Sequence, residues 1–333
     1  MTETTTQPEQ IIDVNGVRLC VQATGHPSDP AVLLVAGTSC SMDWWPPDFC
    51  AALADRGFFV IRFDQRDTGR AHHDPPGAPD YALPDMVADA VGVLDACALP
   101  SAHWVGFSQG GWITQLAALD HPTRVASLVL VSTRATGHGP ADADLPEVSA
   151  RLLAEWATTG AEPDWTDRQS ALDALVAGER SLASEPFDEE TVRDMCRTCL
   201  DRTSDITSAV VNHPIVDQGP RWRERLAEIE APTLVLHGDQ DPLFPHENGE
   251  RLAAAIPHAR FRLVPQVGHE VPRRVWSTYL DAVIDHIHSV LDDPEHFSNS
   301  RTTPSMPART DREPATPDAD EIRARDAYFI RRP

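Results

Sequence analysis

Three residues of this chain have the types and the order that nucleophilic catalysis by a serine requires. Ser108 lies in Gly106-Phe-Ser-Gln-Gly110, Asp241 in Gly238-Asp-Gln-Asp-Pro, and His269 directly after Gly268. A serine hydroxyl must lose its proton as it attacks, and histidine has a pKa suited to taking and returning that proton. A carboxylate such as Asp241 would hold the imidazole in the useful tautomer. The set predicts acyl transfer that needs no metal and no cofactor.

The tetrahedral intermediate of such a reaction carries a negative charge, which two backbone N–H groups can stabilise. One predicted donor is Gln109, directly after the nucleophile, and the other is Thr38, in a loop of small residues that follows a predicted strand. Four aromatic residues are expected to line an apolar substrate pocket: Trp44, Trp45, Phe107 and Trp156.

Other titratable residues compete for these roles. Asp239 lies two residues before Asp241, but Asp241 stands further along the loop and precedes a proline, which favours it as the acid. His213 is expected to be a loop or cap residue rather than a second base. His286 and His288 lie in the last predicted helix and are expected at the surface.

Strands and helices must bring the three residues together. A strand at 102–105 and a helix at 112–119 place Ser108 on a strand-to-helix turn. Asn15-Gly16 predicts a hairpin turn near the start of the chain. Further strands are predicted at 31–36, 58–63, 125–131, 231–237 and 260–264, alternating with helices at 48–56, 85–97, 246–255 and through about 291. This alternation is typical of an α/β fold whose central sheet is mostly parallel, with helices on both faces.

The alternation stops between residues 134 and 228, where the sequence shows helical periodicity without convincing strands. This block predicts a helical cap over the active site. The first part of the core would then cover 1–133, with the nucleophile, and the second part 229–291, with the acid and the histidine. Prolines scattered among Ser, Thr, Asp and Arg predict a disordered tail at 292–333.

Composition excludes several function classes. The net charge of the 333-residue chain is −23, which opposes binding to nucleic acid or to an anionic membrane. All 28 basic residues are Arg, so Schiff-base chemistry on a lysine is excluded. We expect a cytoplasmic protein with reduced thiols, since neither a signal peptide nor a membrane-spanning run is evident. The expected partner is a small-molecule ester, and the oligomeric state stays open.

The triad motifs, with a cap between them, resemble the α/β-hydrolase fold family over about residues 10–291. Three stretches are similar to the aclacinomycin methylesterase group of actinobacterial esterases: Leu33-Leu-Val-Ala-Gly37, Asp64-Gln-Arg-Asp-Thr-Gly69-Arg and Ile113-Thr-Gln-Leu-Ala117-Ala-Leu-Asp-His121. The resemblance implies that the chain cleaves an ester, such as a methyl ester of a bulky, polyketide-like natural product, through an acyl-enzyme.

Other activities are compatible with the same fold. The same triad could hydrolyse a lactone, thioester, amide or carbon–carbon bond, or form a peracid without a cofactor. Epoxide hydrolases and dehalogenases of this family use an aspartate as the nucleophile, which the serine at position 108 disfavours. A ligand-binding protein with an idle triad is a hypothesis from another class, and the reactivity of Ser108 discriminates it from an enzyme.

Overall fold

The computed structural model describes residues 5–138, 142–158 and 163–292. Its described strands form one eight-stranded sheet in the order β1-β2-β4-β3-β5-β6-β7-β8. Strand β2 is antiparallel to β1 and to β4, and every neighbouring pair from β4 to β8 is parallel. The strand bounds are Gln10–Val14, Val17–Thr24, Ala31–Val35, Phe59–Asp64, Ala102–Phe107, Val125–Val131, Thr233–Gly238 and Arg260–Val264, for β1 to β8. The mostly parallel sheet predicted from the sequence is confirmed.

Alternate residues of the central strands point to opposite faces of the sheet, and both faces are buried. On β3, Leu33 and Val35 join one apolar cluster, whereas Val32 and Leu34 join the other. The first cluster packs under α2 (Leu83–Ala96), α3 (Gln109–Asp120) and α8 (Glu247–Ala255). The second packs under α1 (Pro47–Ala54) and α9 (Trp276–Asp292). Because side chains on both faces of the sheet are buried, these strands are expected to be continuous runs of apolar residues.

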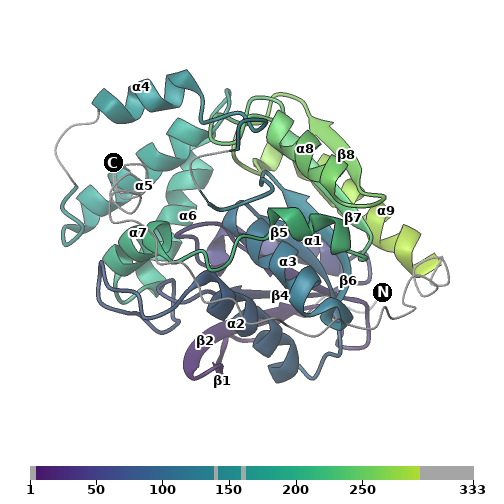
Figure 1. Ribbon diagram of the computed structural model, residues 1–333. Coiled ribbons are helices and arrows are strands. Elements are labelled where there is room, and N and C mark those ends of the chain that lie inside the picture. The colour runs from purple at the N-terminus through teal and green to yellow at the C-terminus, as the bar shows by residue number, and fades with distance from the viewer. Residues whose placement is uncertain (1–4, 139–141, 159–162, 293–333) are drawn as a thin grey trace, which may run out of the picture.

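The chain between β6 and β7 folds as helices, as the periodicity predicted. In its described part these are α4 (Ala150–Thr158), α5 (Arg168–Leu182), α6 (Glu189–Arg202), α7 (Ile206–Ile215) and the 3-10 helix η3 (Arg223–Glu228). Helices α4 to α7 gather at one side of the sheet, away from α8 and α9 (Figure 1). We call this group the cap helices.

The prediction that His286 lies at the surface is wrong: it is 2% exposed, because α9 turns it toward Pro232, whose carbonyl oxygen lies 3.2 Å from Nε2. The predicted tail falls outside the described residues, except for Asp292, which ends α9. In the described ranges, no helix has both the length and the apolar character needed to cross a membrane.

Candidate active site

Ser108 lies between β5 and α3 in a backbone conformation that is rare for a residue with a side chain. Its φ is 53° and its ψ is −118°, so the chain reverses sharply from strand to helix. The Ser108 N–H donates to the Val131 carbonyl at 2.9 Å, and the Thr133 hydroxyl donates to the Ser108 carbonyl at 2.8 Å. The end of β6 therefore fixes the turn on both sides of the serine.

Two glycines make this turn possible. A methyl group on Gly106 would come within 2.4 Å of the Gly110 carbonyl oxygen, and one on Gly110 would come within 2.4 Å of the Val35 carbonyl oxygen. Both distances are far below van der Waals contact, so only glycine fits at either position. The structure thus explains the spacing of glycine, serine and glycine in the motif.

Asp241 and His269 meet although they come from different loops. Asp241 lies three residues after the end of β7, His269 lies on the loop after β8, and His269 Nδ1 is 2.8 Å from Asp241 Oδ2. Both side chains are buried. Asp239 instead contacts the backbone of the loop after β8, where its Oδ1 accepts a long 3.4 Å hydrogen bond from the Val267 N–H. The preference for Asp241 over Asp239 therefore agrees with the geometry.

All the accepting positions of the Asp241 carboxylate are occupied. Oδ1 accepts the N–H groups of Leu243 and Phe244 at 2.9 and 2.8 Å, and Oδ2 receives His269 together with His237, whose Nε2 is 3.3 Å away. Burial alone would raise the pKa of Asp241, but His269 and His237 lower it to about 2. The carboxyl group is therefore an anion at neutral pH, and Nδ1 of His269 must carry the hydrogen. In the neutral ring, Nε2 then holds the lone pair that a general base needs.

His237 was not foreseen from the sequence. Its Nε2 is 2.7 Å from the Phe244 carbonyl oxygen, which can only accept, so this nitrogen bears the hydrogen. A methyl group on Gly249 would come within 2.5 Å of Nδ1, so a glycine is needed beside the ring. The one signal in the sequence is the position of His237 directly before Gly238, the residue that ends β7.

The ring of His269 packs against aromatic residues next to Ser108 and after Asp241. Its centroid is 4.9 Å from that of Phe107, the residue before Ser108, and 5.3 Å from that of Phe244. The backbone of the histidine is held from the cap helices, because the His269 N–H donates to the Leu182 carbonyl at the end of α5 at 2.8 Å. Residues 108, 241 and 269 thus gather at the carboxyl ends of β5, β7 and β8.

The loop that carries Thr38 lies against the nucleophile. A methyl group on Gly37 would come within 3.2 Å of Ser108 Cβ. Gln65 holds this loop from the end of β4, since its Nε2 donates to the Ala36 carbonyl at 3.0 Å. Thr38 and Gln109 therefore stand on two segments that border Ser108, as the proposed pair of oxyanion donors requires. Gln65 belongs to the stretch 64–70 named above for its resemblance, but the sequence alone indicates no role for this side chain.

The predicted aromatic pocket residues take different places. Trp44 stacks on Phe107, the residue before Ser108, with ring centroids 3.8 Å apart. Trp45 lies further into the core, 2% exposed, where it contacts Phe49 at 5.3 Å between centroids. Trp156 is partly buried on α4 and packs at the margin of the larger apolar cluster. Roles in substrate binding stay predictions for all four.

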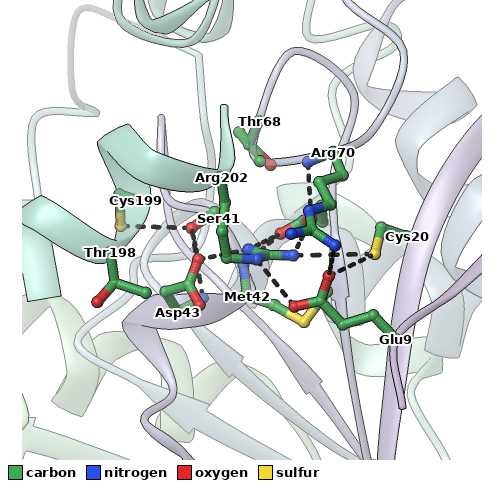
Figure 2. Close-up of polar contacts among 12 residues, drawn as sticks. Glu9, Cys20, Ser41, Met42, Asp43, Thr68, Arg70, Thr198, Cys199 and Arg202 are labelled. Atoms are coloured by element: carbon green, nitrogen blue, oxygen red, sulfur yellow. Dashed lines mark hydrogen bonds and ion pairs between the residues drawn. The ribbon is translucent and has the colours of Figure 1, made fainter. Parts of the chain in front are cut away.

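An ionic cluster fixes the segment that follows the Thr38 loop. Arg202, at the end of α6, pairs with three carboxylates, and Figure 2 shows it between Asp43 and Glu9. Its Nη2 is 2.7 Å from Asp64 Oδ2, its Nε is 2.9 Å from Glu9 Oε1, and Nη1 pairs with Asp43. Ser41 adds a hydrogen bond to Asp43 at 2.8 Å. The cluster joins the cap helices to β4, to the N-terminal segment and to the short helix η1 (Met42–Trp44).

The described residues offer no metal centre, since they contain no group of three or more His, Cys, Asp or Glu side chains placed to hold an ion. A cavity of about 380 Å³ opens at the amino ends of β7 and β8. Its lining includes Thr233, Arg260 and His286. Ser108 lies at the other end of the strands, after the carboxyl end of β5. This cavity is therefore separate from the candidate active site.

Comparisons with known proteins identify the family and the fold. The family model described as the alpha/beta hydrolase fold matches residues 30–272. Rhodomycin D methylesterase DauP of Streptomyces sp. (strain C5) is 32% identical over 84% of this chain and 98% of its own length, and rhodomycin D methylesterase DnrP of Streptomyces peucetius is 31% identical with the same coverage. The crystal structure of esterase RhEst1 from Rhodococcus sp. ECU1013 superimposes with a TM-score of 0.66, at 22% identity, over 85% of this chain and 98% of its own.

Proposed function

The chain belongs to the alpha/beta hydrolase fold family, and from that premise we propose that it hydrolyses carboxylic esters through an acyl-enzyme on Ser108. The observation that carries the proposal is the buried pair of Asp241 and His269, held 2.8 Å apart beside the turn that bears the serine. A carboxylate that orients a neutral imidazole is what an otherwise unreactive hydroxyl needs to become a nucleophile.

In the first half-reaction, Ser108 Oγ attacks the ester carbonyl carbon while its proton moves to Nε2 of His269. The carbonyl oxygen becomes an oxyanion, for which the N–H groups of Gln109 and Thr38 are the proposed donors. Asp241, which stays ionised, stabilises the imidazolium that forms. When the tetrahedral intermediate collapses, the alcohol leaves with the proton from His269, and the acyl group stays on Ser108.

In the second half-reaction, water attacks the acyl carbon and gives its proton to His269. The same donors hold the second oxyanion. Collapse returns the proton to Ser108 Oγ and releases the carboxylic acid. The sum is ester plus water giving acid plus alcohol, and no step needs a metal or a redox partner.

For the substrate, we propose a methyl ester of a bulky, polyketide-like natural product. The support is similarity to two relatives named rhodomycin D methylesterases, which this chain matches over 98% of their length. The stacked rings of Trp44 and Phe107 next to Ser108 would present an apolar surface to such a molecule.

Hydrolysis of nitrophenyl esters and of methyl esters of polycyclic acids tests this function, with Ser108→Ala beside the wild type. We expect turnover by the wild type and a loss of about 10⁴-fold or more in kcat for the variant. A preference for large polycyclic methyl esters over methyl acetate would support the substrate proposal. Absence of turnover by the well-folded wild type on every ester would contradict the function and favour a ligand-binding role.

A further inference from the structure

The loop that carries the proposed oxyanion donor Thr38 is tied to the cap helices by one buried histidine. The Ser39 N–H donates to Nδ1 of His213 at 2.9 Å, across 174 residues of sequence. The other ring nitrogen, Nε2, lies 2.7 Å from the Arg66 carbonyl oxygen. His213 belongs to α7 and is 1% exposed, so this contact is shielded from water.

These two partners define the state of the ring. A carbonyl oxygen only accepts, so Nε2 carries the hydrogen, and Nδ1 has the lone pair that the Ser39 N–H uses. Burial lowers the pKa of His213, although the Arg66 carbonyl and the Asp67 carboxylate act in the other direction. A protonated ring would place an N–H against the Ser39 N–H, so the contact requires the neutral form.

Helix α7 is itself firmly seated, so His213 is a fixed support. Asn212 donates from Nδ2 to Asp67 Oδ2 at 2.9 Å and accepts the Gly77 N–H at 2.7 Å. One turn earlier, the Ser208 hydroxyl donates to the Asp74 carbonyl at 2.7 Å. Three side chains on one stretch of the helix therefore bind the segment 66–77, and His213 reaches from there to the loop.

The loop needs such a support because its backbone is strained. Ser39 has a φ of 62°, a left-handed conformation that a residue with a side chain rarely adopts. It belongs to a tight turn in which the Cys40 N–H donates to the Gly37 carbonyl at 3.2 Å. Thr38 is the preceding residue of the same turn. Releasing the Ser39 N–H would let the turn relax and would shift the Thr38 amide.

We propose that His213 is a positioning residue, which holds the loop so that the Thr38 N–H points at the oxyanion. The inference rests on the proposed function, because it assigns a role in that reaction. It adds that the cap helices supply part of the preorganisation on which the oxyanion hole depends. A change in the packing of α7 on the segment 66–77 would then also change the rate of the chemical step.

Two near-isosteric variants separate the two contacts of the ring. His213→Asn keeps an acceptor oxygen where Nδ1 stands and loses the donor to Arg66, whereas His213→Gln keeps a donor near Nε2 and loses the acceptor for Ser39. We expect kcat for a nitrophenyl ester to fall about 10- to 100-fold in His213→Gln with little change in KM, less than the loss of a whole oxyanion donor. We expect His213→Asn to stay within about threefold of the wild type.

Affinity for an alkyl boronic acid, whose serine adduct resembles the tetrahedral intermediate, should fall in parallel with kcat. In the His213→Gln background, Ser39→Gly should recover much of kcat, because glycine adopts the left-handed conformation without strain. Equal losses in the Gln and Asn variants, or wild-type kcat in folded His213→Gln, would overturn the inference. If His213→Gln fails to fold, a large loss of kcat in folded His213→Asn is by itself enough to overturn the inference, because that variant keeps the acceptor for Ser39. Turnover by the wild type in the same assay tests the proposed function separately.

Discussion

At the scale of single residues, the site depends on which carboxylate faces the histidine. Asp241 lies 2.8 Å from His269 Nδ1, whereas Asp239 turns to the Val267 N–H two residues before the histidine. Both aspartates are on one short loop, so they make a matched pair for mutation. Only the loss of Asp241 should leave the imidazole free to adopt the wrong tautomer.

We therefore expect Asp241→Asn to lower kcat for a nitrophenyl ester by about 10³- to 10⁴-fold. Asp239→Asn should change kcat less than about tenfold, since the side chain makes only a long hydrogen bond to Val267, which an amide oxygen can still accept. Steady-state kinetics on both folded variants check this. A larger loss in Asp239→Asn than in Asp241→Asn would reverse the assignment of the acid.

The ionisation of Asp241 also predicts how stability depends on pH. Its pKa in the folded protein is about 2, below its usual 3.8, so its ionisation stabilises the fold above pH 4. This contribution is lost as the pH falls through the folded-state value. The free energy of unfolding of the wild type relative to Asp241→Asn should therefore drop by about 1 kcal/mol between pH 6 and pH 3. Urea titrations at a series of pH values measure it, and a constant difference would contradict the shift.

At the scale of elements, close contact between β3, β5 and α3 sets the shape of the turn at Ser108. Gly110 lies against the Val35 carbonyl, whereas at Gly178, inside α5, a methyl group would have no atom within 4 Å apart from its chain neighbours and the nearby backbone of its own helix. Substitution by alanine should therefore have opposite effects at the two positions. At position 178 the higher helix propensity of alanine favours the folded state, whereas at position 110 the added methyl group would overlap with the backbone of β3.

Gly110→Ala should destabilise the protein by about 2 kcal/mol or more and remove most of the esterase activity, because α3 must move away from β3. Gly178→Ala should stabilise the protein by about 0.5–1 kcal/mol and leave kcat unchanged. Thermal unfolding and ester hydrolysis of the two variants give both numbers. An active, unchanged Gly110→Ala protein would show that the tight turn is not needed.

The contact between α6 and the core is a second feature at this scale. Arg202 pairs with three carboxylates, and its side chain is only 8% exposed (Figure 2). Glu9 also pairs with Arg70, but removal of Arg202 takes away the cation that the buried Asp43 and Asp64 face. Arg202→Met should cost about 3–5 kcal/mol of unfolding free energy. Arg168→Met breaks an exposed pair with Asp201 and should cost less than about 1 kcal/mol. Equal costs in urea unfolding would argue against a structural role for the cluster.

At the scale of the whole molecule, the sheet and the order of the site residues could be predicted from the sequence. Strands buried on both faces are continuous apolar runs, and Ser108, Asp241 and His269 each stand in a short local motif. The side-chain contacts that support the site could not be predicted, because they join segments far apart in the sequence. His213 reaches Ser39 across 174 residues, and Arg202 reaches Glu9 across 193. No local pattern shows such pairs, and the burial of His286 was missed for the same reason.

Labelling with a fluorophosphonate measures whether this fold activates Ser108. Intact-mass analysis should show one adduct per chain on the wild type and none on Ser108→Ala. Because the folded chain brings residues 108, 241 and 269 to the same ends of the strands, labelling should also disappear in denaturant together with the tertiary structure. An unlabelled, well-folded wild type, or an adduct that persists in Ser108→Ala, would contradict the account.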